Sequence, residues 1–490
     1  MRTAKVCCLM ALIILVPGCE KYRAKPLATH QILVDVERTR RLLATIESDP
    51  SSVTSSDSQK TPKPDFTFAR AADLMRTHSP SLKEAKAEYE TVRASATIKT
   101  PFPNPSVEAG PQFGFGPDLS SASPYTPFGS LGFTIPTGKR LKRQDELNRA
   151  HADLARMESA IKYRELYLEL RRQFSRLALA HSRISAKRKI ADSARESTTL
   201  TKRLIEVGTA TALDVGLIEL EQARLQMDMY SAETTLADVA ADLSKLIGVH
   251  TDHFVPMPES ALAWLPDSVP SLKQLQQMLT QNHPGLARLR ARYEVSEREL
   301  RLEVAKQYPD FTIGPHFSRE VGERKNVLGL TLGIELPIFD RNQQAVATAK
   351  KRRDEIQVKY EAEANRALAG LDRAWRGYEL ASGKLKLLKT SVLPKASANI
   401  ELARKSIEAG ATDSLRFLET ERSQRAVLLD ALETELAVRE SWVELELAVG
   451  YPLMLLPGET SLFVPAPLEP QTAPATLHLE ADVKRSFPHE

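Results

Sequence analysis

The chain has 490 residues, of which 42% are hydrophobic and 27% charged, so it can bury a sizeable core and is not a disordered polymer. Its 67 Lys and Arg residues nearly balance 63 Asp and Glu residues, and the net charge of +4 argues against nucleic acid as a partner. Mean hydropathy is −0.29, and no apolar run reaches the ~18–20 residues of a membrane helix. A helical membrane protein is therefore excluded, whereas membrane β-strands are not.

Residues 1–18 have the organisation of a secretory signal peptide. Arg2 and Lys5 precede an apolar run from Val6 to Val16. Gly18 and Cys19 then predict a lipoprotein, in which Cys19 becomes the acylated first residue. The alternative is ordinary cleavage near Gly18 with Cys19 incidental. All three cysteines lie in the first 19 residues, so disulfides, thiol catalysis and cysteine metal sites are excluded for the mature chain.

The rest of the sequence contains two copies of one unit of about 200 residues. Pro80 recurs as Pro284, an offset of 204 that holds for over 30 residues, and later the offset becomes 202, where Gly248 meets Gly450. These matches predict a lipidated segment and linker over 19–65, a first repeat over 66–250, a connector over 251–270, a second repeat over 271–451 and a Pro-rich tail over 452–490.

Each repeat has the same predicted order of elements. A helix of roughly 35 residues comes first, over 66–100 and again over 271–306. Two short strands follow, over about 105–136 and about 309–337. A very long helix comes next, over 140–206 and 343–408, and a return helix then ends at Gly248 or Gly450. Apolar residues recur every seven positions, as in a coiled coil, at Leu147, Leu154, Ile161, Leu168 and, on the return helix, Ile218, Leu225, Ala232, Val239 and Leu246. On the helices alone, a structural coiled coil is the preferred interpretation.

The short strands change that interpretation. Leu328, Leu330 and Leu332 alternate with Gly329 and Thr331, the apolar-out, polar-in pattern of a transmembrane barrel wall. Four strands cannot close around a pore, and lipid does not tolerate an open edge. The sequence therefore predicts a mainly α protein with a membrane β part: a trimeric 12-stranded β-barrel, four strands per chain, continuous with a periplasmic coiled-coil tunnel. A soluble sandwich fits strands separated by such long helices badly.

These features resemble the TolC family of outer-membrane efflux channels over about 66–455. Two strings are similar to its heavy-metal, CzcC-like branch: the segment from Leu336 to Gln343, LPIFDRNQ, and the segment from Thr137 to Arg140, TGKR. The resemblance implies a homotrimer in the outer membrane, extending into the periplasm. It also implies two partners, a periplasmic adaptor and an inner-membrane pump of the RND type.

The resemblance also implies adaptor-contact tips at the two long turns, near 208 and 410. The tip residues are Val207, Gly208, Thr209 and Thr211 in the first repeat and Gly410, Ala411 and Thr412 in the second. Small residues permit close backbone approach, and Gly permits a helix to reverse. The alternative is that these positions are helix caps and nothing more.

Family members close the periplasmic mouth with acidic residues just past the tip. Asp214 fits this pattern, Arg416 departs from it, and Glu419 restores an acidic position. In a trimer each forms a ring of three charges, which predicts a cation-selective gate. Arg416 either opposes the acidic ring or pairs with a carboxylate to lock it. The alternative is a solvated helix face.

The sequence shows no catalytic, cofactor or metal-binding motif, so we expect a passive channel that is not an enzyme and binds no cofactor. Its expected role is to conduct substrates, with heavy-metal cations as one class and drugs or a type I secreted protein as alternatives. Two other functions stay open at this point. One is a periplasmic adaptor, which two hairpins and four strands disfavour, and the other is a structural coiled-coil envelope lipoprotein.

Overall fold

The computed structural model describes residues 22–46, 66–113, 125–206, 211–250, 269–319, 325–409, 411–412 and 414–453. The chain divides into two units, 1–56 and 57–490. The first unit contains helix α2 (Thr29–Ile46), on which Leu33 and Val36 are exposed. The predicted signal peptide and Cys19 lie outside the described residues, as do residues 47–65 and most of the connector and of the tail.

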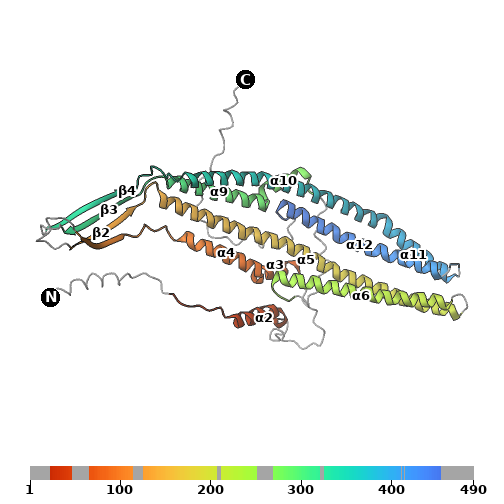
Figure 1. Cartoon of the computed structure of the whole chain (residues 1–490). Helices are drawn as coiled ribbons and strands as arrows, with labels where there is room; N and C mark the ends of the chain where they lie inside the picture. The colour runs from red at the N-terminus through yellow and green to blue at the C-terminus, as the bar shows by residue number, and fades with distance from the viewer. Residues whose placement is uncertain are drawn as a thin grey trace, which may run out of the picture. The chain divides into compact units, whose positions relative to one another are not determined.

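The second unit is mainly helical and shows the repeated order of elements (Figure 1). The first copy has α3 (Phe68–His78), α4 (Pro80–Thr97), β1 (Ser106–Phe113), β2 (Tyr125–Ile135), α5 (Arg140–Glu206) and α6 (Ala212–Ile247). The second has α8 (Leu272–Asn282), α9 (Pro284–Ala305), β3 (Phe311–Arg319), β4 (Asn326–Ile334), α10 (Gln343–Leu387), η3 (Leu388–Val392), α11 (Leu393–Glu408) and α12 (Ser414–Val449). Among the described residues, no helix combines the length and hydropathy that a membrane span requires.

The leading helix of each repeat is broken in two, so the prediction of single helices over 66–100 and 271–306 is wrong. The breaks lie before Pro80 and Pro284, because a proline ring disfavours helical conformation in the preceding residue. That residue is extended in both copies, with ψ of 123° at Ser79 and 122° at His283. The His283 ring also caps α9 by accepting from the Leu286 N–H at 3.4 Å. Burial lowers the pKa of His283, which favours the neutral ring that the cap requires.

The second long helix is also interrupted, whereas the first runs through 67 residues as α5. The predicted helix over 343–408 contains the π-helical turn η3, and Pro394 follows in the first turn of α11. Proline lacks the N–H that would continue the helical ladder, and a π-turn is a common way to absorb such a defect. The two repeats therefore differ within their longest helix.

Each return helix ends on a glycine that packs against the break in the leading helix. Gly248 has φ +87° and Gly450 has φ +78°, a conformation that other residues adopt only with strain. A Cβ on Gly248 would lie 2.6 Å from the His78 carbonyl oxygen, and one on Gly450 would lie 2.9 Å from that of Asn282. The two contacts occupy equivalent positions in the two repeats. In each repeat, the end of the return helix therefore packs against the break in the leading helix of the same repeat.

The four strands form one antiparallel sheet in the order β1-β2-β3-β4, in which β2 and β3 join the two repeats. The register places Val107 opposite Leu131, and Ile313 opposite Leu332, so the apolar residues share one face. That face is exposed in the single chain, as Leu330 shows with 73% of its surface accessible. Strands β1 and β4 are the two edges of this sheet.

Both sequence strings that resemble the heavy-metal branch form junctions where a strand becomes a helix. The Thr137 hydroxyl donates to the Pro309 carbonyl oxygen at 2.6 Å, and Arg140 pairs with Asp310 at 2.6 Å. In the second copy, Asn342 has φ +57° and its side-chain amide donates to Glu303. These contacts fix the direction in which each long helix leaves the sheet.

The helices pack side by side in one layer, in one order next to the sheet and in another order further away. Next to the sheet the order is α4, α5, α9, α10, and further away it is α6, α5, α12 and then α10 with α11 (Figure 1). Near the sheet, Thr100 donates from its hydroxyl and its backbone N–H to Asp145 of α5, at 2.5 and 2.8 Å. These two hydrogen bonds hold the pKa of Asp145 below its usual value, and the bond from the Thr100 hydroxyl has the larger effect.

A core cluster lies where each broken helix docks onto its repeat. In the first copy, Phe66 and Phe68 pack on Tyr167 and Phe174 of α5 with ring centroids 5.6–5.7 Å apart. In the second, Trp442 stacks edge-on against Tyr378 within the cluster Leu275, Leu279, Leu286, Ala367, Leu371, Val438, Leu445 and Val449. The apolar cores therefore lie at the ends of the return helices, between the sheet and the tips.

We expect Gly248→Ala to destabilise the chain by about 1–2 kcal/mol or more, because Ala is strained at this positive φ and its Cβ would meet backbone. The measurement is the midpoint of thermal unfolding, followed by circular dichroism. Gly383→Ala is the matched control: it lies mid-helix with no neighbouring atom within 4 Å, and should gain up to ~1 kcal/mol of helix propensity. Equal effects of the two changes would contradict this account of Gly248.

Candidate functional site

The helix tips at the far end from the sheet are the first candidate site. Helix α5 ends at Glu206 and α6 begins at Ala212, while α11 ends at Glu408 and α12 begins at Ser414. Thr211 and Ala411 are exposed and Thr412 is half-buried. The Ala411 N–H donates to the Ser406 carbonyl oxygen at 2.8 Å, the long bond of a Schellman cap.

Four of the predicted tip residues, Val207, Gly208, Thr209 and Gly410, lie outside the described residues. The sequence has Gly at position 410, next to Ala411, and glycine is the residue that a Schellman cap favours at that place. The cap accounts for a small residue here on local grounds. Contact with an adaptor therefore stays a prediction for both tips.

The predicted gate residues lie in the first two turns of the return helices. Asp214 is in the first turn of α6, and its side chain lies outside the described residues. Arg416 and Glu419 are exposed on α12 and line one groove of about 420 Å³ between α11 and α12. The structure thus brings Arg416 and Glu419 to a shared surface, whereas Asp214 belongs to the other hairpin.

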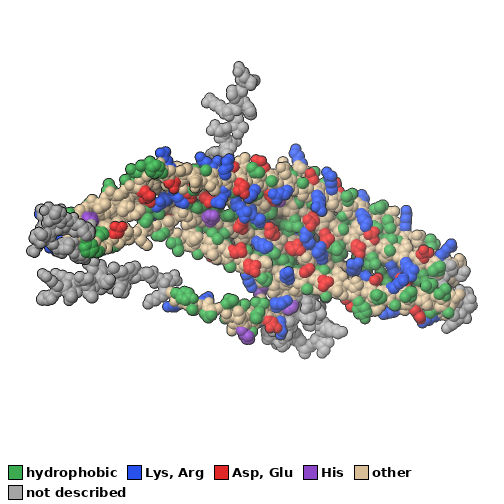
Figure 2. Space-filling view, in the orientation of Figure 1, with side chains coloured by type: hydrophobic (Ala, Val, Ile, Leu, Met, Phe, Trp, Pro, Cys, Tyr) green, Lys and Arg blue, Asp and Glu red, His purple; other side chains and the backbone are tan. Residues whose placement is uncertain are grey.

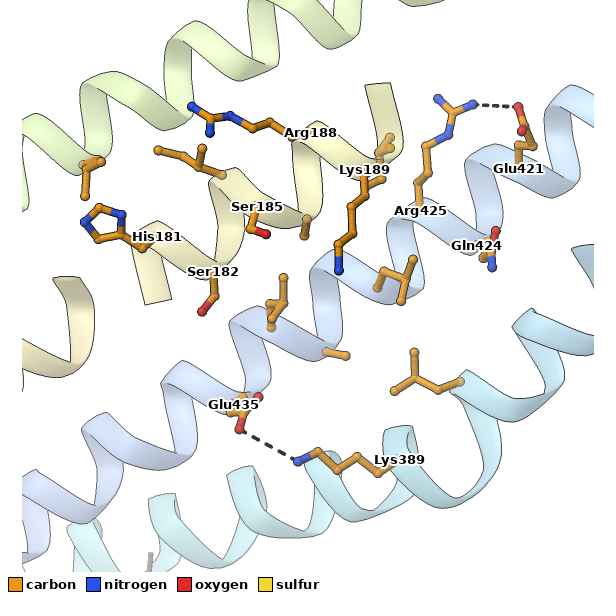
Figure 3. A pocket seen from close by; sticks show the side chains of 18 residues that line it. His181, Ser182, Ser185, Arg188, Lys189, Lys389, Glu421, Gln424, Arg425 and Glu435 are labelled. Atoms are coloured by element: carbon orange, nitrogen blue, oxygen red, sulfur yellow. Dashed lines mark hydrogen bonds and ion pairs between the residues drawn. The ribbon is translucent and has the colours of Figure 1, made fainter. Parts of the chain in front are cut away.

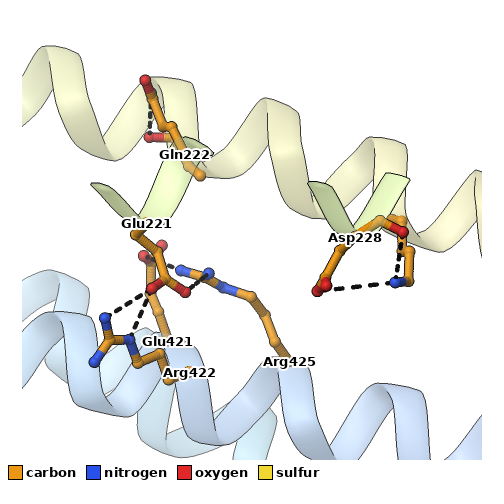
Figure 4. Close-up of polar contacts among 8 residues, drawn as sticks. Glu221, Gln222, Asp228, Glu421, Arg422 and Arg425 are labelled. Carbon is orange, nitrogen blue, oxygen red and sulfur yellow. Dashed lines mark hydrogen bonds and ion pairs between the residues drawn. The ribbon is translucent and has the colours of Figure 1, made fainter. Parts of the chain in front are cut away.

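A charged network behind the tips joins the two return helices (Figure 4). Glu221 of α6 accepts from Arg422 at 2.7 Å and from Arg425 at 3.0 Å, both on α12. Arg425 also donates to Glu421 at 3.0 Å. Glu221 and Glu421 are buried, with 9% and 6% of their surfaces exposed. Two buried carboxylates thus balance two guanidinium groups, of which Arg425 is nearly buried and Arg422 is half-exposed.

This network was not among the residues singled out from the sequence. Glu219 and Glu421 occupy equivalent positions in the two repeats, whereas the match between the repeats gives no reason to single out Glu221. The available signal was a carboxylate close to the apolar seam of α6, where a buried acid needs a cationic partner. The partners, Arg422 and Arg425, come from the other repeat, which no local pattern reveals.

A ladder of ion pairs continues this contact along α5 and α12. Arg183 pairs with Glu433, Arg176 with Glu440 and Arg172 with Glu444, each at 2.5 Å. The residue numbers rise on one helix as they fall on the other, as antiparallel packing requires. Exposed pairs of this kind contribute ~0–1 kcal/mol each, so they set register more than stability.

At the end of the ladder nearest the core clusters, the pair Arg171–Glu446 is fully buried, with N and O atoms 2.5 Å apart. Glu446 also accepts from the Trp442 indole N–H at 3.2 Å and from the Leu453 backbone N–H at 2.9 Å. The Arg171 guanidinium lies 5.7 Å from the Tyr167 ring centroid. This pair fixes α12 and the segment after it to α5.

A cavity of about 1060 Å³ lies between the ladder and the charged network. It is lined by α5, η3 and α12, with contributions from α6 and α11. Lys189 extends into it from α5, and the pairs Arg425–Glu421 and Lys389–Glu435 border it (Figure 3). Apolar residues such as Ile184 and Leu428 complete the lining, so the space is neither purely polar nor purely apolar.

Charges of both signs are mixed over the helical surface, where Lys and Arg side chains lie among Asp and Glu side chains (Figure 2). Within the described ranges, no group of three or more His, Cys, Asp or Glu side chains could hold a metal ion.

The model of the outer membrane efflux protein family matches residues 71–249 and 275–451, which is most of both repeats. The chain belongs to this family. Proteins of the family are outer-membrane channels that work with an adaptor and an inner-membrane pump, so the chain is the channel component of an efflux system. Membership decides against the adaptor and the structural lipoprotein as alternatives.

Relatives agree with this assignment. The cobalt-zinc-cadmium resistance protein CzcC of Cupriavidus metallidurans is 27% identical over 286 residues, covering 58% of this chain and 68% of that protein. Among solved structures, CusC superposes with a TM-score of 0.65 at 16% identity, over 82% of this chain and 96% of that one. The open state of MtrE from Neisseria gonorrhoeae gives 0.63 at 15% identity, over 82% and 96%. These superpositions show that the outer membrane efflux protein has the channel fold.

We expect Glu221→Gln to weaken the contact between α6 and α12 by about 2–3 kcal/mol per chain. A fully buried pair costs ~3–5 kcal/mol to break, but the Arg422 side chain is 47% exposed. Hydrogen–deuterium exchange should rise in the first turns of both return helices. Glu219→Gln is the control, because Glu219 pairs with Lys202 at an exposed site worth ~0–1 kcal/mol. Unchanged exchange in Glu221→Gln would exclude a stabilising role.

Proposed function

We propose that three copies of this outer membrane efflux protein form a passive channel, with a 12-stranded barrel in the outer membrane and a helical tunnel in the periplasm. The supporting observation is the four-stranded sheet, whose apolar face is exposed and whose edges β1 and β4 have no neighbour in the described chain. Unpaired strand edges are not tolerated in lipid, so β1 of one copy would pair with β4 of the next.

The channel is proposed to act without catalysis or cofactor. Substrates would enter from an adaptor and an inner-membrane pump of the RND type and leave to the exterior. A conduit of this kind needs no tight binding site, because tight binding would slow release.

Heavy-metal cations are the proposed substrates. Two observations support this class: the likeness to a cobalt-zinc-cadmium resistance protein and the LPIFDRNQ string from Leu336 to Gln343. Drugs and a type I secreted protein are the alternatives. Cell-associated Zn²⁺, Co²⁺ and Cd²⁺ in a strain that lacks the chain tests the choice, since unchanged metal levels with raised drug sensitivity would favour drugs.

The mature chain is further proposed to carry a lipid anchor at Cys19, in addition to its barrel strands. The supporting observation is the short apolar run that ends at Gly18 and Cys19. Mass spectrometry of the N-terminal peptide tests this, because cleavage without acylation would leave an unmodified thiol.

The tips at Val207–Thr211 and Gly410–Thr412 are proposed to contact the adaptor, and Asp214, Arg416 and Glu419 to close the resting tunnel mouth. Support comes from the position of these gate residues in the first turns of α6 and α12. In a trimer, residues this close to the turns would converge on the axis. Threefold symmetry would then repeat each weak ion pair three times.

Leu330→Lys should disfavour membrane assembly by ~2–4 kcal/mol per chain, because the mutation places a charge on the lipid-facing side of β4. The yield of the trimer in outer-membrane fractions, sized by light scattering after detergent extraction, is the measurement. Thr331→Lys is the matched control on the opposite face of the same strand, where water is expected. A stable monomer of the unmodified chain in detergent would refute the trimer.

The function itself is tested by single-channel recording in planar bilayers. The unmodified chain should open rarely and prefer cations, and Arg416→Ala should raise its conductance. Adding Asp214→Ala and Glu419→Ala should also lower the preference for cations, because the acidic rings are then removed. If the triple variant conducts like the unmodified chain, these residues are a solvated face and the gate lies elsewhere.

A further inference from the structure

Helix α2 of the first unit presents an exposed apolar stripe along one side. Ile32 and Val36, one turn apart, are 45% and 51% exposed, and the sequence continues the same helical spacing with Leu43 and Ile46. Leu33, at the border of this stripe, is 68% exposed. Helix α2 is therefore amphipathic, and in water its apolar side faces solvent.

The charges of the same segment leave an excess of cations. The two carboxylates of α2 each pair within the helix, Asp35 with Arg38 at 4.0 Å and Glu37 with Arg41. Three other cations from residue 22 to 46 form no ion pair in the part of the chain that the structure describes: Arg23, Lys25 and Arg40. An apolar stripe combined with surplus positive charge is typical of a helix that binds the surface of an anionic membrane.

The length and charge of α2 suit a position on a membrane and not across one. The helix has 18 residues, five of them charged, whereas a spanning helix needs ~20 consecutive apolar residues. An amphipathic helix of this kind lies in the interface, with its apolar side among acyl chains and its cations near the headgroups. Just before the helix, Tyr22 is 91% exposed and Leu27 76%, and tyrosine is enriched at membrane interfaces.

The chain is long enough for α2 to stay at a membrane while the first repeat is docked elsewhere. Nine residues separate Cys19 from Thr29, and when extended they span at most ~35 Å. After α2, the next described residue is Phe66, which packs against Phe174, about 50 Å along α5 from the end next to the sheet. Residues 47–65 span at most ~65 Å, so they can bridge that distance.

The alternative occupant of the stripe is another helix, because its positions also have coiled-coil spacing. Thr29 and Thr39 fall on this seam, which spans little more than two heptads. So short a seam with two threonines buries little apolar surface against a partner helix, and it gives the surplus cations no role. A lipid surface uses both the stripe and the cations.

We propose that α2 lies on the periplasmic leaflet of the outer membrane and binds anionic phospholipid, with Ile32 and Val36 among the acyl chains and Arg40 at the headgroups. The proposal rests on the barrel and the lipid anchor proposed above, and it adds a membrane contact that neither of them includes. The first repeat is then tied to the membrane through the chain that leads to Phe66 as well as through its strands.

Site-specific fluorescence on the full-length chain tests this contact. A single introduced cysteine is labelled with the NBD fluorophore, and the chain is reconstituted in vesicles of phosphatidylethanolamine and phosphatidylglycerol. The unmodified chain, whose Cys19 thiol is blocked when acylated, gives the background. With Val36→Cys, the emission should shift to the blue and be quenched several-fold more by a nitroxide on the lipid acyl chains than by one in water.

Val34→Cys is the matched control, because the same change is made two residues away, on the opposite side of the same helix. Its label should respond mainly to the water-soluble quencher. In vesicles of phosphatidylcholine alone, lipid quenching at Val36→Cys should fall several-fold, and unchanged quenching would overturn the role of the cations.

A third label separates this proposal from the one on which it rests. Leu330→Cys places the fluorophore on the apolar face of β4 and reports whether the barrel is inserted in the same vesicles. Lipid quenching at residue 330 without it at residue 36, or with equal quenching at 34 and 36, overturns the contact of α2 and leaves the channel proposal intact. A blue-shifted label at residue 36 that neither quencher reaches means that α2 packs on protein, which also overturns it. Absence of lipid quenching at both 330 and 36 overturns both proposals.

Discussion

The ion pair between Arg171 and Glu446 is a fully buried ionic contact between the two repeats, and it joins α5 of the first to α12 of the second. Both side chains are fully buried, and Glu446 also receives hydrogen bonds from Trp442 and from the backbone of Leu453. Removing one partner of such a pair leaves a buried charge, which costs ~3–5 kcal/mol. The pair therefore fixes α12 against α5, and the ladder of exposed pairs takes its register from it.

Helix α5 joins the two repeats, because it packs against helices of both. It contacts α4 and α6 of its own copy, and α9 and α12 of the other. It is also the longest uninterrupted helix, whereas its counterpart contains η3 before Pro394. The uninterrupted α5 therefore provides a common support for helices of both repeats.

The sequence predicted the architecture because the architecture depends on period and repetition. Alternating leucines from Leu328 to Leu332 marked β4, and heptads marked the side of α6 that packs on α5. The breaks at Pro80 and Pro284 were missed, because apolar spacing continues across a proline although the backbone does not.

The candidate site was predicted less well, for a physical reason. Arg416 and Glu419 could be found because they follow a turn at a fixed distance, and they do share a groove. Glu221 with Arg422 and Arg425 could not, because a buried ion pair between distant helices leaves no local trace. Only the packing of α6 near α12 makes these three residues neighbours.

The two repeats are held together by different forces at their two ends. At the sheet, backbone hydrogen bonds between β2 and β3 join the repeats, and salt does not screen such uncharged contacts. Towards the tips the repeats also meet through exposed Arg–Glu pairs, which ionic strength screens. High salt should therefore loosen the exposed contacts between the repeats towards the tips first, while backbone hydrogen bonds keep β2 and β3 joined.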